Sequence, residues 1–179
     1  MAPANRYTPP KSVGNGRTFS RNLTGRNELR AGITQLSDQV AARLRRHGLK
    51  CQGISLSIRD PEFHDVSRQH RLPSPTYLGR EIAGAAMALA DGFWRMDRPV
   101  RAVTVTALYL IPEEEAGAQL DLLAGAQEEK RERLEKLAGA MDAIRAKFGT
   151  DAITPASARR GLGDGHAPPP GSRTYSEEN

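Results

Sequence analysis

The order in which helix-like and strand-like patterns alternate over the first 112 residues limits the possible folds more than any other feature. Within residues 23–48, apolar side chains recur at spacings of 4, 3, 4 and 4, the period of one helix face. Thr24 is placed to cap this helix and Gly48 to end it. A second helical pattern follows Thr76, which we expect to be its N-cap. The two stripes are Leu29, Ile33, Leu36, Val40 and Leu44, and then Leu78, Ile82, Ala86, Leu89 and Phe93.

Strand-like segments surround these helices and place apolar residues at every second position. The clearest covers residues 50–60, and a second covers residues 62–72, after which Pro-Ser-Pro-Thr is expected to break the chain. We expect a short strand over Arg17–Arg21 and a last strand over residues 98–112. The apolar positions of these strands are Ile54, Leu56, Ile58, Val66, Leu72, Val103, Val105 and Ala107.

The resulting order, β-α-β-β-α-β, predicts an α+β fold with two helices on one face of a four-stranded antiparallel or mixed sheet. The opposite face would be open, and its expected side chains are small hydroxyls and arginines. Small side chains let a bulky partner approach, and arginines supply positive charge, a combination that suits a nucleic-acid backbone. The alternative is an ordinary polar outer face.

The composition changes after this folded unit, and the acidic segment that follows contains one compact apolar cluster, Gln-Leu-Asp-Leu-Leu. The cluster is either a short peptide ligand for a partner's pocket or a helix turn. We therefore divide the chain into a linker (1–10), the folded domain (11–112), an acidic flexible tether (113–129), a short amphipathic helix (130–153) and a disordered tail (154–179). The helix carries Leu134, Leu137, Met141, Ile144 and Phe148 at helical spacing.

Charge is divided unevenly along the chain, whose formal net charge is +5. Residues 1–112 contain 17 Lys and Arg against 8 Asp and Glu, whereas residues 113–179 contain 9 against 13. A basic domain is a candidate polyanion-binding surface because Lys and Arg pair with phosphates and release counterions. The alternative is that arginine is simply a common surface residue in a protein encoded by a GC-rich genome.

Several other function classes are not supported by the residue types. The single cysteine, Cys51, allows no internal disulfide and no cysteine-based zinc site, and the four histidines lack ligand spacing. We expect no metal, no membrane partner and a cytoplasmic location, because no apolar run of 18 residues or signal peptide is present. The basic, glycine-containing segment Lys11–Leu23 lacks the order G-x-x-x-x-G-K-[ST] of a nucleotide-binding loop.

Several ordered pieces of the sequence resemble one known family. They are KSVGNGRTFSRNLTGRNEL, AARLRRHGL, FHDVSRQHRLPSPT, RPVRAVTVTALYLIP, QLDLL and LEKLAGAMDAIRAKFGTDAI. Over roughly residues 10–155 the chain resembles the C-terminal little-finger domain of Y-family translesion DNA polymerases, especially the bacterial DNA polymerase IV type. The resemblance implies a little-finger fold that binds damaged or primer–template DNA in repair and lesion bypass.

The resemblance also implies specific contacts. The segment Lys11–Arg21 would run along the template strand, with backbone amides near phosphates and with glycines that let the main chain approach the DNA. Side chains on the sheet edges would grip the duplex backbone, and residues 119–123 would bind the replicative sliding clamp. The implied DNA-binding residues are Lys11, Ser12, Gly14, Gly16, Arg17, Thr18, Arg21, Arg59, Arg68, His70 and Arg71, and the implied clamp ligand is Gln119, Leu120, Asp121, Leu122 and Leu123.

Three positions depart from the family pattern. Leu123 stands where the clamp peptide commonly ends in Phe, which predicts weaker clamp binding. His70 stands where Arg is usual, which predicts a pH-dependent contact. Leu108-Tyr109 replaces a small Ser-Gly type pair, which predicts a changed approach of DNA to the last strand.

The family's polymerase chemistry, with its two Mg²⁺ ions, belongs to a palm domain that the resemblance does not include. We therefore expect no catalytic residue, no cofactor and no polymerisation by this chain alone. The expected partners are DNA and the sliding clamp. One alternative is a chain of a split DNA polymerase IV that needs a separately encoded polymerase core. The other is a ferredoxin-like regulatory domain for a small metabolite, since fold alone does not fix function.

Overall fold

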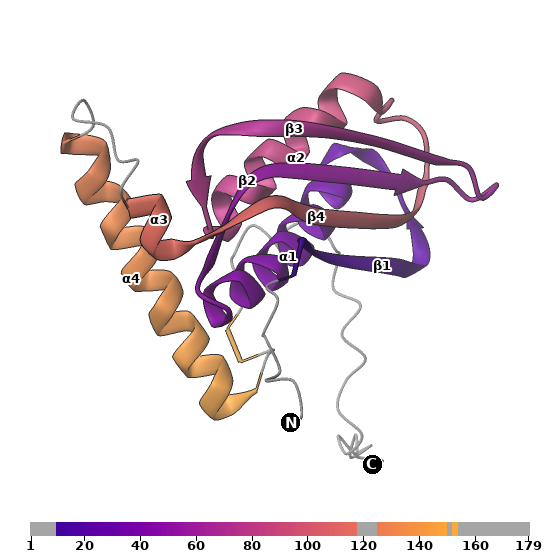
Figure 1. The fold of residues 1–179 in the computed structure, drawn as a ribbon. Coiled ribbons are helices and arrows are strands. Elements are labelled where there is room, and N and C mark those ends of the chain that lie inside the picture. The colour runs from indigo at the N-terminus through magenta and orange to yellow at the C-terminus, as the bar shows by residue number, and fades with distance from the viewer. Residues whose placement is uncertain (1–9, 118–124, 150–151, 154–179) are drawn as a thin grey trace, which may run out of the picture.

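Four strands form one antiparallel sheet in the computed structural model, which describes residues 10–117, 125–149 and 152–153. The strands are β1 (Ser12–Leu23), β2 (Leu49–Arg59), β3 (Asp65–Thr76) and β4 (Val100–Pro112), in the spatial order β1-β4-β2-β3. The helices are α1 (Gly25–Arg46), α2 (Gly79–Phe93), α3 (Glu113–Gly117) and α4 (Gly125–Phe148). Figure 1 shows α1 and α2 together behind the sheet, and α4 at one end of the domain. The predicted α+β architecture is confirmed.

The core lies between the sheet and the two helices, where the predicted stripes meet. Every residue of the predicted α1 stripe is buried, as are Ile54, Leu56 and Ile58 of β2 and the alternating apolar residues of β4. In α2 the stripe residues Leu89 and Phe93 are only half-buried, because they pack at the margin of this core.

Two predicted element boundaries are wrong. Strand β3 does not break at Pro-Ser-Pro-Thr but continues to Thr76, and its register shifts after Arg71 pairs with Gly53. Proline is tolerated there because β3 is an edge strand, on which a missing N–H removes no bond within the sheet. Helix α2 begins at Gly79 rather than directly after Thr76, whose Oγ1 instead accepts a hydrogen bond from the Leu78 N–H at 3.0 Å.

The first strand and the first helix also differ in detail from the expectation. Strand β1 spans 12 residues instead of the five of Arg17–Arg21. Thr24 occupies the N-cap position of α1, but its side chain makes no capping bond; its backbone N–H donates to the carboxylate of Glu28 at 2.8 Å. This is the reciprocal half of a capping box, displaced by one residue.

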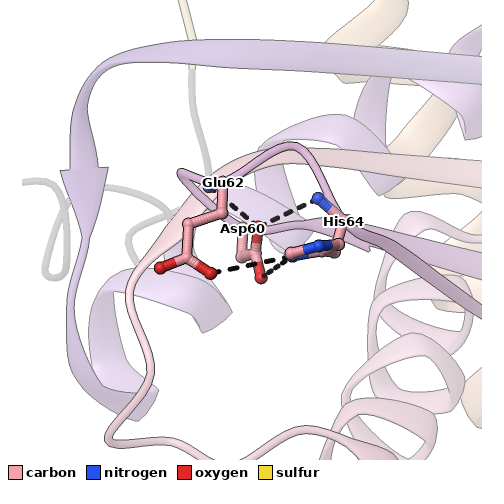
Figure 2. Close-up of side chains that lie close together, drawn as sticks. All are labelled: Asp60, Glu62 and His64. Atoms are coloured by element: carbon pink, nitrogen blue, oxygen red, sulfur yellow. Dashed lines mark hydrogen bonds and ion pairs between the residues drawn. The ribbon is translucent and has the colours of Figure 1, made fainter.

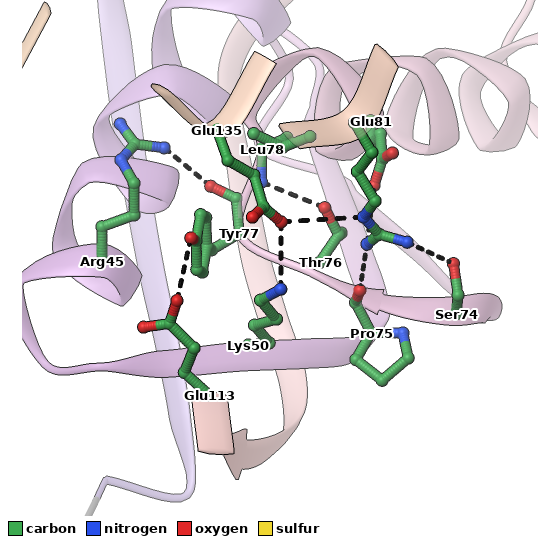
Figure 3. A network of polar contacts seen from close by, with 11 residues as sticks. Arg45, Lys50, Ser74, Pro75, Thr76, Tyr77, Leu78, Glu81, Glu113 and Glu135 are labelled. Atoms are coloured by element: carbon green, nitrogen blue, oxygen red, sulfur yellow. Dashed lines mark hydrogen bonds and ion pairs between the residues drawn. The ribbon is translucent and has the colours of Figure 1, made fainter. Parts of the chain in front are cut away.

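Helix α4 is held on the domain mainly by charged side chains. Arg45 donates to the Asp142 carboxylate at 2.6 and 2.9 Å, and Arg145 pairs with Asp38 at 2.5 Å. Figure 3 shows a third pair, in which Lys50 contacts Glu135 at 3.0 Å. By contrast, Leu137, Ile144 and Phe148 of the predicted amphipathic stripe are exposed. Leu134 of that stripe and Ala138 pack against the core, so the ion pairs and these two side chains together define the face that α4 turns to the domain.

Helices α3 and α4 include part of the segment predicted as a tether. Within the described ranges, no helix is long and apolar enough to cross a membrane.

Candidate nucleic-acid interface

The pairing register shows which side chains lie on the sheet face opposite α1 and α2. Residues directly opposite each other on neighbouring strands point to the same face. Because Ile54, Leu56 and Ile58 are buried against the helices, Ser55 and Ser57 must point the other way. We call this second side the open face. Its two central rows across the four strands are Gly16–Thr104–Ser57–Ser67 and Gly14–Thr106–Ser55–Gln69.

The centre of the open face is built almost entirely from glycines and small hydroxyl side chains. A shallow, mostly polar depression of about 230 Å³ lies toward one end of it. Arg59 is the cation whose side chain lies on the open face beside this depression, whereas the side chain of Arg17, also a lining residue, is directed to the helix side. The residues that line it are Gly16, Arg17, Thr18, Ser57, Arg59, Asp65, Ala102 and Thr104. A flat, hydroxyl-rich surface with cations at its margin can accept a phosphate backbone without steric obstruction.

Gly14 and Gly16 have a structural reason to be glycine in addition to the predicted approach of DNA. A Cβ on Gly16 would lie 2.5 Å from Oγ1 of Thr104, its partner on β4. A Cβ on Gly14 would lie 2.9 Å from Oγ1 of Thr106. The threonine side chains therefore occupy the space that a side chain at either glycine would fill.

Strand β1 is an edge strand, so alternate backbone groups have no partner strand. The Gly14 carbonyl accepts a hydrogen bond from Nη1 of Arg43 in α1 at 2.9 Å, which indicates that it points to the free edge. The N–H and C=O of one residue in an antiparallel strand point to the same side. The amide of Gly14, and that of Gly16 two residues later, therefore point to the free edge, where they can donate to an anion.

The predicted cations of β1 are distributed around this edge. Lys11 is exposed directly before the strand. Arg17 pairs in register with Val103 and thus lies on the helix side, where Nη1 donates to Oε1 of Gln35 at 3.1 Å. Arg21 forms a two-point ion pair with Glu28 at 2.8 and 3.0 Å. This contact lowers the pKa of Glu28 below its usual value. Arg21 is therefore partly neutralised, whereas Lys11 and Arg17 have no acidic partner among the described residues.

Arg59 lies on the open face but is also neutralised. Its guanidinium donates to both carboxylate oxygens of Asp65, the residue opposite it on β3, at 2.7 and 2.9 Å. This hydrogen bonding lowers the pKa of Asp65, so the carboxylate stays charged at neutral pH. A phosphate at this position would have to compete with Asp65 for Arg59.

The pairing register separates the three remaining predicted residues of β3. Arg68 and His70 are opposite the buried residues Leu56 and Ile54, so both are directed to the helix side. There the guanidinium of Arg68 lies 5.8 Å from the ring centre of Phe93 in α2. Arg71 is opposite Gly53 and lies on the open face. All three residues lie on an edge strand, but their side chains are divided between the two faces of the sheet.

The turn between β2 and β3 brings Asp60, Glu62 and His64 together, with possible ligand atoms within 4.8 Å (Figure 2). The buried Asp60 carboxylate already accepts the backbone N–H groups of Glu62 at 2.9 Å and His64 at 3.0 Å. The guanidinium of Arg98 contacts its second oxygen at 2.9 Å. The hydrogen bonds from His64 and Glu62, the backbone bond from His64 first, lower the pKa of Asp60. Because a cation already contacts this carboxylate, we assign it to closing the turn rather than to binding a metal.

The predicted clamp ligand, Gln119–Leu123, lies outside the described residues. The helix before it is anchored: the Glu113 N–H donates to the Gly48 carbonyl at 2.8 Å, and the Tyr77 hydroxyl donates to the Glu113 carboxylate at 3.0 Å (Figure 3).

Two residues at the interface were not predicted as site residues. Arg43 reaches the β1 edge from α1, and no local pattern indicates that contact. Tyr109 has a positive φ of 53° and its ring lies against Gly53. The sequence did contain a signal for Tyr109, since Leu108-Tyr109 stands where the family usually has a Ser-Gly type pair. Glycine readily adopts a positive φ, so the usual glycine indicates that the backbone at this position is left-handed.

Comparisons with known proteins show which family the sequence resembles. Residues 10–122 match the impB/mucB/samB family C-terminal domain. The DNA polymerase IV of Acetivibrio thermocellus is 36% identical over 86% of this chain and 37% of its own length. That of Moorella thermoacetica is 31% identical over 86% of this chain and 36% of its own length. This chain thus spans little more than a third of these curated relatives.

One solved structure is a complex of the beta-clamp processivity factor and the little finger domain of PolIV. It aligns with 63% of this chain and 98% of its own, at 23% identity and a TM-score of 0.47. From the extent of the family match, this chain belongs to the impB/mucB/samB family and contains that family's C-terminal domain.

Proposed function

We propose that this chain is a DNA-binding module that grips the DNA backbone with the open face of its sheet and the free edge of β1. The observation that carries the proposal is the pair of central rows made of glycines and small hydroxyls, bordered by cations. The family supports it, because the relatives named above are DNA polymerases.

The proposed contacts follow from where each group lies. The amides of Gly14 and Gly16 and the hydroxyls of Ser12 and Thr18 donate to phosphates along β1. Lys11, Arg17 and Arg21 supply positive charge beside that strand. On the β3 side of the sheet, Arg71 contacts a phosphate from the open face, whereas Arg59 does so only in competition with Asp65. Arg68 and His70 extend the charge around the β3 edge.

These contacts address phosphates and sugars rather than base edges, so the module should bind DNA with little sequence preference. Primer–template and damaged DNA are then suitable ligands, because backbone contacts tolerate an altered base.

A salt titration tests the proposal. Each phosphate neutralised by Lys or Arg contributes about −0.9 to the slope of log K against log salt concentration. Lys11, Arg17, Arg68 and Arg71 have no acidic partner among the described residues, whereas Arg21 and Arg59 are paired. We therefore expect a slope of roughly −3 to −5 on primer–template DNA. Binding that is absent at low salt, or that is independent of salt, would refute the proposal.

We further propose that Gln119, Leu120, Asp121, Leu122 and Leu123 bind a replicative sliding clamp, as the sequence resemblance implies. Replacing Gln119 and Leu122 with Ala should abolish pull-down of the clamp. A matched control is the replacement of Glu132 and Lys136, exposed residues of α4, with Ala, which should leave pull-down intact. Replacing Leu123 with Phe should strengthen it. Equal capture of both double variants would contradict this role.

Polymerisation is proposed to require residues beyond this domain, because the match is to a C-terminal domain and the relatives are much longer. This chain alone should give no primer extension with Mg²⁺ and nucleotides. If it is one chain of a divided enzyme, adding a separately produced polymerase core should restore extension. Extension by the chain alone would refute this assignment.

A further inference from the structure

The ring of Tyr109 lies on the open face although its place in the strand predicts the other side. Val103, Val105 and Ala107 of β4 are buried against the helices, so alternation would direct Tyr109 there too. Its backbone instead adopts a φ of 53°, a left-handed conformation that is unusual for a residue with a bulky side chain. This conformation reverses the direction of the side chain.

On the open face, the Tyr109 ring contacts one residue of β2, Gly53, and one residue of β3, Arg71. A Cβ on Gly53 would lie only 2.6 Å from Cδ2 of the Tyr109 ring, so the ring occupies the space that a side chain at position 53 would fill. Arg71, opposite Gly53 on β3, places its guanidinium 4.0 Å from the ring centre. The ring is 41% exposed, so it is part of the surface and not of the core.

The guanidinium of Arg71 differs from that of Arg59 in its partner. Arg59 is held by the carboxylate of Asp65, whereas Arg71 has no ion pair within the part of the chain that the structure describes; its contact is the aromatic ring. Stacking on a ring fixes the plane of a guanidinium without neutralising its charge. The fork of donors at its edge remains free for a phosphate.

The Tyr109–Arg71 stack places a cation at the end of the open face that lies away from Arg59. Gly53 and Arg59 are six residues apart on β2, which corresponds to about 20 Å at about 3.4 Å per residue. Phosphates of one DNA strand are spaced by about 3.4 Å along the helix axis, so this length matches about six steps.

We propose that Tyr109 is a positioning residue for DNA binding: it holds Arg71 on the open face as a free phosphate ligand. This inference rests on the proposed DNA contact of the sheet. It explains two features together: the positive φ of Tyr109 and the glycine at position 53 both allow the Tyr109 ring to stack on Arg71. The ligand group is the phosphate of the DNA backbone.

The test compares the Kd and salt slope of six variants with the wild type on primer–template DNA. Arg71→Ala should weaken binding several-fold and make the slope less negative by about 0.9. Tyr109→Gly should reproduce most of this loss, because the guanidinium is then unfixed. Glycine adopts the left-handed conformation readily, so this variant should keep its melting temperature. Tyr109→Phe keeps the ring and should bind like the wild type.

Combining Tyr109→Gly with Arg71→Ala should cost little more than Arg71→Ala alone, because both changes remove one contact. Gly53→Ala tests the stack without replacing Tyr109 or Arg71, because the added Cβ would displace the Tyr109 ring. It should weaken DNA binding as Tyr109→Gly does. Phe148→Ala is the control for loss of an exposed aromatic, because Phe148 is 68% exposed on α4. It should not change DNA binding.

Two results would overturn the inference. One is a wild-type protein that binds DNA with the expected slope while Tyr109→Gly binds equally well; this leaves the proposed function standing. The other is a fully additive loss in the double variant, which would show that the ring does not act through Arg71. If the wild type itself fails to bind DNA, the proposed function and this inference fail together.

Discussion

The Arg59–Asp65 pair leads to a counterintuitive prediction: removing a carboxylate should improve DNA binding. On the open face, the Asp65 carboxylate accepts hydrogen bonds from Nε and Nη2 of Arg59 at 2.9 and 2.7 Å. Asp65→Asn releases that guanidinium and removes a negative charge beside the proposed phosphate position. The geometry of the sheet should not change, because the amide has the same shape as the carboxylate.

The size of the effect follows from the exposure of the pair. The side chains of Arg59 and Asp65 are 44% and 49% exposed, so water already screens their attraction and the cost of separating them is small. We expect Asp65→Asn to tighten DNA binding about two- to fivefold at 50 mM salt. One additional phosphate contact makes the slope more negative by about 0.9, which removes about 3.5-fold of affinity by 200 mM salt. The advantage should therefore almost disappear at the higher salt concentration.

The chain offers a closely matched control on the helix layer. Arg26 of α1 pairs with Asp91 of α2 at 2.7 and 3.0 Å, and their side chains are 43% and 42% exposed. Asp91→Asn changes the net charge by the same amount but frees a guanidinium away from the open face. Fluorescence anisotropy of labelled primer–template DNA over a salt series measures both variants. An equal gain for both, or a loss for Asp65→Asn, would refute the placement of DNA on the open face.

Three further predictions concern stability and reactivity. Leu56 is fully buried in a central strand, so Leu56→Ala should destabilise the domain by about 2–5 kcal/mol in chemical denaturation, and a loss below about 1 kcal/mol would contradict the assigned core. Burial raises the pKa of the Cys51 thiol to about 12, so a thiol reagent at pH 8 should modify it only as the protein unfolds, and rapid native labelling would contradict its burial. The lowered pKa of Asp60 implies stability that is present above the unfolded-state pKa near 3.8 and lost as pH falls through the folded-state value. Asp60→Asn should therefore lower the melting temperature at pH 7 and reduce its fall toward pH 3; an unchanged pH profile would show that the turn does not depend on this carboxylate.

The order of elements could be predicted from sequence because the core stripes follow simple periods. Leu29 to Leu44 follow a helical period, and Ile54, Leu56 and Ile58 follow a strand period, so local spacing reports the burial that tertiary packing produces. The end of β3 could not be predicted in this way. Its two prolines argue against a central strand but are tolerated in an edge strand. Whether a strand lies at the edge depends on the arrangement of the whole sheet, which local sequence does not show.

The sequence could predict for some of the basic residues which face of the sheet their side chains occupy. Val66, Arg68 and His70 stand at every second position of β3, so their side chains point to the same face of the sheet. Since Val66 is the apolar anchor of this strand, the sequence already predicts that Arg68 and His70 point to the helix side. The side of Tyr109 was not readable, because its positive φ breaks the alternation of β4. Nor were the partners of α4: Arg45 and Asp142 are 97 residues apart, and no local pattern joins them.

The central claim is that DNA lies on the open face, and amide chemical-shift mapping with unlabelled primer–template DNA tests it most directly. The account predicts the largest changes at Gly14, Gly16, Ser57 and Thr104, and small changes at Gly84 on the outer side of α2. Changes concentrated on the outer surfaces of α1 and α2, with the open face unaltered, would contradict it.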